Sequence, residues 1–140
     1  MITHTATKSH LSDLYASYGT DTYKMALYSS DASLDKDTTA YTTDGEVSGA
    51  GYTAGGVALT ASASMLAFDG DVLIIDWEDP SWASASFTAR GALIYNSSDS
   101  NKSAVVIDFV DDQTVASSTF TFSFPLPTKD TAIIRGILLS

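Results

Sequence analysis

The feature that most constrains the fold is a two-residue alternation of apolar and polar side chains. It is cleanest in residues 119–124, TFTFSF, where Phe120, Phe122 and Phe124 alternate with threonine and serine. Residues 85–96, ASFTARGALIYN, alternate in the same way. Successive side chains of a β-strand point to opposite faces, so this period predicts strands with one buried and one exposed face.

Other segments have the lengths and boundaries of short strands, and roughly seven or eight are expected in all. The apolar run at 71–77, DVLIIDW, is bounded by acids and predicts a buried central strand. Residues 104–110, AVVIDFV, follow the turn formers SSDSNKS and predict the return strand of a hairpin. The remaining expected strands are 21–28, 57–60, 65–68 and 131–139. This spacing predicts an all-β fold, an antiparallel β-sandwich of jelly-roll or Ig-like type.

One helix is expected, over residues 8–18, with Ser9 as its N-cap and Gly19 at its end. Its apolar residues at helical spacing are Leu11, Leu14, Tyr15 and Tyr18. The sequence shows no internal repeat and no interdomain linker. We therefore expect a short N-terminal helical arm over residues 1–20 and a single β-sandwich domain over residues 21–140.

Composition excludes several classes of partner and site. The net charge of −10 argues against nucleic acid and against an anionic membrane surface. The absence of cysteine removes disulfides and thiolate zinc sites. No apolar run is long enough to span a membrane, and the polar start MITHTATKSH predicts no signal peptide, so synthesis in a cytoplasm is expected. The 20 serines and 17 threonines fit a β protein with polar outer faces.

Residues 45–56, GEVSGAGYTAGG, hold five of the nine glycines. Gly49, Gly51 and Gly55 come close to a dinucleotide-binding fingerprint, which requires a strand before the glycines and a helix after them. Here the preceding segment is polar and the following one alternates like a strand. The pattern favours a loop whose backbone needs positive φ or a close approach to other backbone.

No arrangement of polar residues predicts an enzyme. His4 and His10 lie in the polar arm, and no nucleophile motif accompanies them. Asp76 and Glu78 could hydrolyse a glycosidic bond, although any acidic turn has the same composition. A calcium loop starting at Asp99 would lack its central glycine and its closing glutamate. A calcium site at Asp108, Asp111 and Asp112 would be generic. We therefore predict no catalytic residue, no cofactor and no metal.

The order of several segments resembles a family of small structural proteins of tailed phages. In that family a short helix precedes a DT-K-ALY strand, a TTAY segment and a GEVSG-GYTAGG loop, matched here within residues 21–59. The later segments FTARGALIYN, AVVIDF, TFTFSFP and AIIR are matched at 87–96, 104–109, 119–125 and 132–135. The resemblance covers nearly the whole chain in order, which makes it more specific than any single motif.

The resemblance implies a virion structural protein, most simply a capsid decoration or cement protein that binds the outer lattice and stabilises the head. Its partners would be the major capsid protein of the same phage and further copies of this chain, as a dimer or trimer. The alternative is a tail-fibre or head-fibre module that binds host-surface glycans through aromatic side chains. The predicted contact residues are Tyr41, Gly49, Gly51, Tyr52, Gly55, Gly56, Trp77 and Trp82.

The Gly-rich loop and the N-terminal arm are the longest segments without an expected sheet partner. We expect Tyr41 and Tyr52 to hold the loop on the sandwich, and we expect loop and arm to contact neighbouring subunits. On this hypothesis, exchanging the loop for a short turn abolishes assembly and leaves folding intact.

Overall fold

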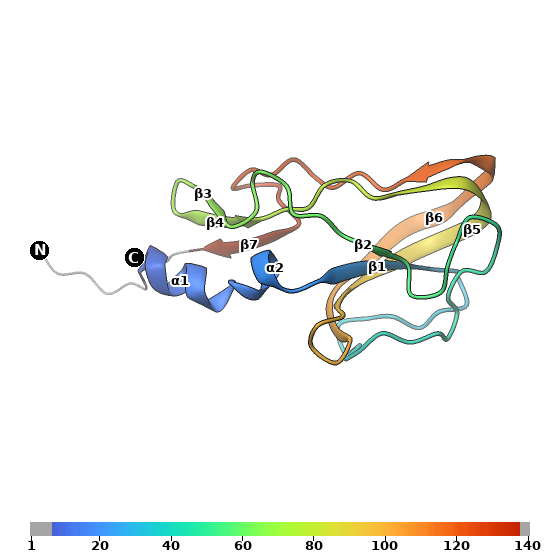
Figure 1. The fold of residues 1–140 in the computed structure, drawn as a ribbon, viewed down its shortest axis with the longest axis horizontal. Helices are drawn as coiled ribbons and strands as arrows, with labels where there is room; N and C mark the ends of the chain where they lie inside the picture. Colours follow the sequence, from blue (N-terminus) through green and yellow to red (C-terminus); the bar gives the residue numbers. More distant parts are fainter. Residues whose placement is uncertain (1–6, 138–140) are drawn as a thin grey trace, which may run out of the picture. The chain divides into compact units, whose positions relative to one another are not determined.

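The computed structural model describes residues 7–137, so His4 lies outside the described residues (Figure 1). The chain falls into two compact units. One contains residues 7–20, 60–78 and 123–137, and the other contains Asp21–Leu59 and Asp79–Phe122. Two stretches that the sequence pattern assigned to a single domain, 60–78 and 123–137, thus group with the N-terminal arm.

Antiparallel strands are the main regular structure of the described chain and far exceed the helices, which confirms the all-β prediction. They form two open sheets, one in each unit. The elements are α1 (Lys8–Leu14), α2 (Ser17–Thr20), β1 (Tyr23–Tyr28), β2 (Val57–Ala58), β3 (Ala67–Asp69), β4 (Val72–Ile75), β5 (Ser81–Asn96), β6 (Lys102–Thr121) and β7 (Ile134–Ile137).

The helix expected over residues 8–18 is present as two shorter helices, α1 and α2. Its N-cap is Thr7 rather than Ser9. Thr7 has an extended backbone and its side chain accepts a hydrogen bond from the backbone N–H of His10. Either residue type can cap a helix, and the extended backbone of Thr7 decides which one does.

The smaller sheet has the strand order β3-β4-β7, all antiparallel. Its central strand, β4, contains Leu73, Ile74 and Ile75, each at most 1% exposed. This confirms the prediction of a buried central strand in the apolar run 71–77. The last expected strand, 131–139, is found as the shorter β7, and residues 138 and 139 lie outside the described chain.

The larger sheet has the order β2-β1-β5-β6. β5 and β6 are its longest strands and run side by side as a hairpin (Figure 1). Their connecting turn places Ser100 and Asn101 at φ values of 51° and 56°, a left-handed conformation that asparagine tolerates better than most residues. The predicted hairpin is confirmed.

β6 contains the strand expected at 104–110 and the first three residues of the strand expected at 119–124, in one element of 20 residues. Residues 122–124 lie beyond its end, so the second prediction is confirmed only in part. The join between the two segments is a large irregular bulge in β6. Ala89 pairs with Gln113 and Gly91 with Asp108, so two steps along β5 match five along β6, and three extra residues are accommodated. Val110, inside the bulge, has φ 71°. An isolated strand pattern cannot reveal such a bulge, because the extra residues are defined only by the partner strand.

One face of the larger sheet carries a core cluster from β1 and β5. Its buried members are Ala26, Tyr28, Leu93 and Tyr95, and the partly buried residues packed on them are Ala32, Leu34 and Tyr41. The latter come from residues 29–56, which connect β1 to β2 and contain the Gly-rich loop. The connection therefore lies over the sheet and contributes to its core.

Candidate functional site

The Gly-rich loop, residues 45–56, is organised by the carboxylate of Glu46. This half-buried group accepts hydrogen bonds from the phenols of Tyr41 and Tyr52, each at 2.6 Å, and from the backbone N–H of Gly55 at 2.7 Å. Hydrogen bonds to an ionised acceptor are shorter and stronger than those between neutral groups. One side chain thus holds residues before and after the first glycines in a fixed arrangement.

The loop is also bonded to the sheet beneath it. The phenol oxygen of Tyr52 accepts from the backbone N–H of Leu27 at 3.0 Å, and the backbone N–H of Val47 donates to the Leu27 carbonyl at 2.9 Å. From β5, the phenol of Tyr95 donates to the Gly55 carbonyl at 2.7 Å. β1 and β5 therefore hold the loop directly, with Tyr52 among the holding groups.

These contacts correct the expectation that the loop lacks a sheet partner. Tyr28 forms a β-bridge with Glu46, and Ala50 forms one with Ser86. Exchanging the loop for a short turn would remove Glu46 and its three hydrogen bonds, so that experiment would damage the fold as well as any contact surface. β2 follows the glycines, where a dinucleotide-binding fingerprint would require a helix.

Two glycines show why the loop needs this composition. Gly51 and Gly56 have φ values of 79° and 77°. A Cβ on Gly56 would collide with the Met25 carbonyl oxygen, and one on Gly51 would lie 2.7 Å from Cα of Ala85. The loop backbone therefore lies directly against β1 and β5, as the glycine pattern predicted.

Four tyrosines around Glu46 form a cluster with a shared electrostatic property. Burial is the largest cause that raises the pKa of Tyr28, Tyr41, Tyr52 and Tyr95 above the ordinary value of 10. The carboxylate of Glu46 raises each pKa further, because a phenolate beside a carboxylate is repelled. The cluster therefore keeps its phenols neutral and able to donate.

This property predicts a loss of stability in alkali. The folded protein retains phenol protons that the unfolded chain releases from pH 10 upward, so the free energy of unfolding is unaffected below pH 10 and falls as the pH rises further. Ultraviolet absorbance of tyrosinate, recorded with circular dichroism over the same titration, should show these four phenols ionising together with unfolding. Ionisation of all seven tyrosines near pH 10 in a folded protein would contradict the pinned loop.

The structure distributes the predicted contact residues between surface and core. Tyr41, Tyr52 and Gly56 are half-buried, Gly55 is buried, and Gly49 and Gly51 are exposed. Trp77 and Trp82 are 2% and 3% exposed. Trp82 packs on Phe120 in the unit with the larger sheet. Trp77 packs on Phe124, and both of these residues belong to the unit with the smaller sheet. This corrects the interpretation of the two tryptophans as a glycan platform, because neither ring presents a free face for a sugar.

The acidic residues considered for catalysis or metal binding lie in different environments. Asp76 is 7% exposed and accepts a hydrogen bond from the Ser62 hydroxyl at 2.6 Å, while Glu78 is exposed. Among residues 7–137, no group of three or more histidine and carboxylate side chains is placed to hold a metal ion. Asp108 and Asp112 instead flank an arginine.

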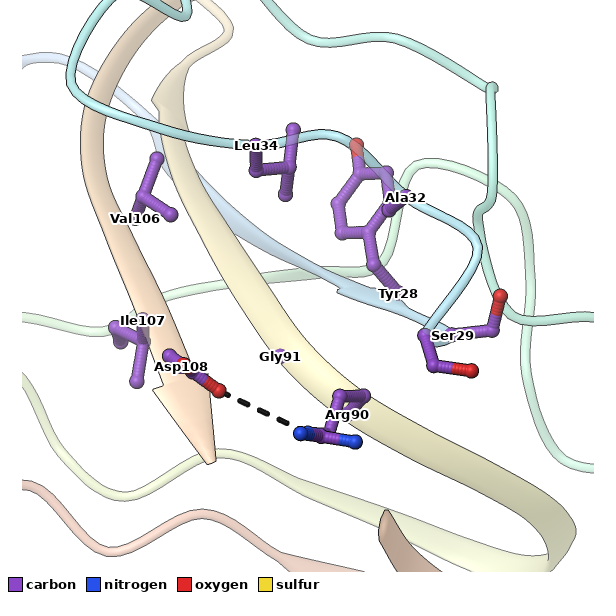
Figure 2. A pocket seen from close by; sticks show the side chains of 10 residues that line it. Tyr28, Ser29, Ala32, Leu34, Arg90, Gly91, Val106, Ile107 and Asp108 are labelled. Atoms are coloured by element: carbon purple, nitrogen blue, oxygen red, sulfur yellow. Dashed lines mark ion pairs between the residues drawn. The ribbon is translucent and has the colours of Figure 1, made fainter. Parts of the chain in front are cut away.

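That arginine, Arg90 on β5, lines a cavity of about 260 Å³ on the same face as the core cluster. Figure 2 shows Gly91 between two sides of the cavity, with Leu34 and Tyr28 on one side and Arg90 and Asp108 on the other. Gly91 pairs with Tyr28 on β1 and with Asp108 on β6, so three adjacent strands contribute at one level of the sheet. A Cβ on Gly91 would lie 2.6 Å from the carbonyl oxygen of Ile107, so glycine lets β5 and β6 approach closely at this level.

Arg90 lies at the bulge of β6 and faces two carboxylates without closing a hydrogen bond to either. Its Nε is 3.9 Å from Oδ1 of Asp108, and its Nη1 is 3.6 Å from Oδ1 of Asp112. Nε is buried and has no hydrogen-bond partner. Sequence patterns missed this site, because the pairing of Arg90 with both acids depends on the three extra residues of the bulge.

Comparisons with protein-family models, with curated proteins and with solved structures return no match for this chain. Within the described part of the chain, no helix is both long and apolar enough to cross a bilayer. The chemistry of the Gly-rich loop, the cavity and the exposed strands is therefore the basis for a functional proposal.

Proposed function

We propose that this chain is a virion structural protein of a tailed phage, a capsid decoration protein that acts by binding. The ordered resemblance of its segments to small phage structural proteins supports this assignment. The structural observation that carries it furthest is the edge of β6 beyond the bulge, where no other described strand pairs with it. Packing of the two sheets as a β-sandwich, of jelly-roll or Ig-like type, belongs to the same proposal.

β6 lies at the edge of the four-stranded sheet, and β5 is the strand it pairs with among the described strands. Near its start, residues 39–41 bond to Asn101 and Ser103. Beyond the bulge, residues 113–121 contain no charged residue and no proline, and most of them are exposed. Edge strands usually carry lysine or proline that blocks further pairing. Apart from Ser117, which has φ 47° and donates its N–H to the Ser86 hydroxyl, this segment can offer main-chain donors and acceptors to a strand of a neighbour.

A rigid sheet that pairs through its edge can connect adjacent subunits of a lattice. The neighbour would be the major capsid protein or a second copy of this chain. Each contact contributes modestly, and many copies on one particle add their effects. The loop pinned by Glu46 supports this role, because a preorganised surface loses little conformational entropy when it binds.

The copy number in purified virions tests the assignment. Quantitative mass spectrometry should find this chain in numbers comparable with those of the major capsid protein. A few copies per particle would indicate a tail or fibre protein, and absence from the particle would refute a virion role.

A second test introduces charge at the edge of β6. Ala116→Lys combined with Thr119→Lys should weaken sedimentation with capsids that lack this protein by at least about tenfold, because a lysine at an edge opposes strand addition. Both positions are exposed, so circular dichroism should stay unchanged. Ala63→Lys, at an exposed position in the other unit, is the matched control. Undiminished capsid binding by the double variant would exclude the β6 edge as the contact.

A further inference from the structure

The cavity beside Arg90 combines one positive and one negative side chain at its polar end. The guanidinium of Arg90 supplies donors, and the carboxylate of Asp108 supplies acceptors. Oδ1 of Asp108 accepts the backbone N–H of Val110 at 2.8 Å, which fixes the orientation of the carboxylate. Ser29 also lines the cavity, and its hydroxyl, which already donates to the Gly45 carbonyl at 3.1 Å, can accept a further hydrogen bond.

The two charged groups are near each other but too far apart to bond directly. Their separation of 3.9 Å exceeds the usual hydrogen-bond distance of about 2.9 Å. The side chains of Arg90 and Asp108 are 41% and 75% exposed, so both are partly reachable from outside, although Nε of Arg90 itself is buried. A donor and an acceptor thus stand side by side with bonding capacity left over.

Another part of the cavity lining is apolar. Leu34 and Val106 line it, and Gly91 lies on its floor (Figure 2). Val106 is 36% exposed, which is high for a large aliphatic side chain on a sheet. A ligand that fills this space needs carbon–hydrogen surface on one side and polar groups on the other.

We propose that this cavity binds a single sugar ring, with two adjacent hydroxyls bridging Arg90 and Asp108 and a carbon–hydrogen face of the ring against Leu34 and Val106. One hydroxyl accepts from the guanidinium and its neighbour donates to the carboxylate. The proposal goes beyond a decoration role, and it stands on different residues from those of the β6 edge.

Other ligand classes fit the cavity less well. An anion would be repelled by Asp108 and Asp112 and by the net charge of −10, and a cation would be repelled by Arg90. A zwitterion would have to separate two charges that already neutralise each other. A drug-sized apolar ligand would need a cavity larger than about 260 Å³. A neutral polyhydroxyl ring satisfies the donor, the acceptor and the apolar wall together.

Heteronuclear NMR of the isotope-labelled full chain provides the test. Methyl glycosides of glucose, galactose and mannose are titrated in turn, with acetate, inorganic phosphate and glycine as comparison ligands. At least one glycoside should cause saturable shifts centred on Gly91 and Arg90, with an affinity on the order of millimolar. The same sugars without the methyl group distinguish a glycan end from a free sugar, since only the glycoside has the substituted anomeric oxygen of a glycan end.

Asp108→Asn should lower the affinity for the responding glycoside by about tenfold, because the amide replaces one acceptor oxygen with a donor. Asp111→Asn, which makes the same change in the same bulge but outside the cavity lining, should leave the affinity unchanged. Arg90→Met is a second variant, which removes the donor and should also weaken binding of the responding glycoside. Three results would overturn the proposal: no saturable shift with any glycoside, stronger shifts with acetate, phosphate or glycine, or equal binding by the Asp108 and Asp111 variants.

Discussion

Replacing Gly56 with alanine is expected to lower the free energy of unfolding by roughly 3–5 kcal/mol. At φ 77° an L-residue is strained by about 1–2 kcal/mol. The larger cost comes from the new Cβ, which would collide with the carbonyl oxygen of Met25. That carbonyl belongs to β1, where Met25 pairs with Val57 and also with Ile94 of β5, so it cannot move without disturbing the register on both sides.

Gly55→Ala is the matched control, because the neighbouring glycine shares the unusual backbone but not the close approach. Its φ is 94°, and a Cβ there would lie 3.4 Å from Oη of Tyr95, an ordinary contact. We expect a loss of about 1–2 kcal/mol for this variant. Urea unfolding followed by the fluorescence of Trp82 in a Trp77→Phe background measures both. Equal losses would show that backbone conformation alone requires the glycines and that the loop does not press on β1.

Glu46→Ala is expected to destabilise the protein by roughly 3–4 kcal/mol. The substitution removes three hydrogen bonds and leaves the phenols of Tyr41 and Tyr52 and the N–H of Gly55 without their acceptor. Gly55 is buried, so its N–H has no ready replacement from water. The same unfolding measurement applies, and the pH at which the tyrosines ionise should also fall, since the carboxylate that opposes ionisation is gone.

Glu46→Gln separates shape from charge in this position. Oε1 of Glu46 accepts from Tyr52 and Gly55, and a glutamine oxygen can keep both bonds. The amide nitrogen then faces Tyr41, whose phenol oxygen can accept from it. We expect a loss of only about 1 kcal/mol. A glutamine variant as unstable as the alanine variant would mean that the charge itself, rather than the number of acceptors, holds the loop.

Several elements of the fold could be predicted because their signals are local. The apolar run of β4 requires burial on both faces, and the turn formers between β5 and β6 allow a left-handed backbone at Ser100 and Asn101. The continuity of β6 could not be predicted in the same way. The sequence shows two separate strand patterns in this region. They form one strand, β6, because β5 pairs with the chain on both sides of the bulge.

The candidate sites also contain some features that the sequence indicated and others that depend on tertiary contacts. The glycine content of residues 45–56 correctly indicated close backbone approach, and Tyr52, one of the tyrosines expected to hold the loop, bonds directly to β1. Nothing in the sequence indicated that Glu46 would hold the loop, because a carboxylate in a polar loop is normally solvated. Trp77 and Trp82 were expected at a surface and are buried, since large aromatic side chains in a small β protein supply much of its core.

The amino-acid sequence by itself determined the strand class, the positions of most strands and the need for glycine in the loop, because alternation, turn chemistry and positive φ act within a few residues. Only the tertiary structure decided which carboxylate accepts hydrogen bonds from the loop tyrosines and which carboxylate faces Arg90 at the cavity. Those choices join residues far apart in the chain. They depend on strand register and on one bulge, and a single residue of slip would place each side chain on the opposite face of the sheet.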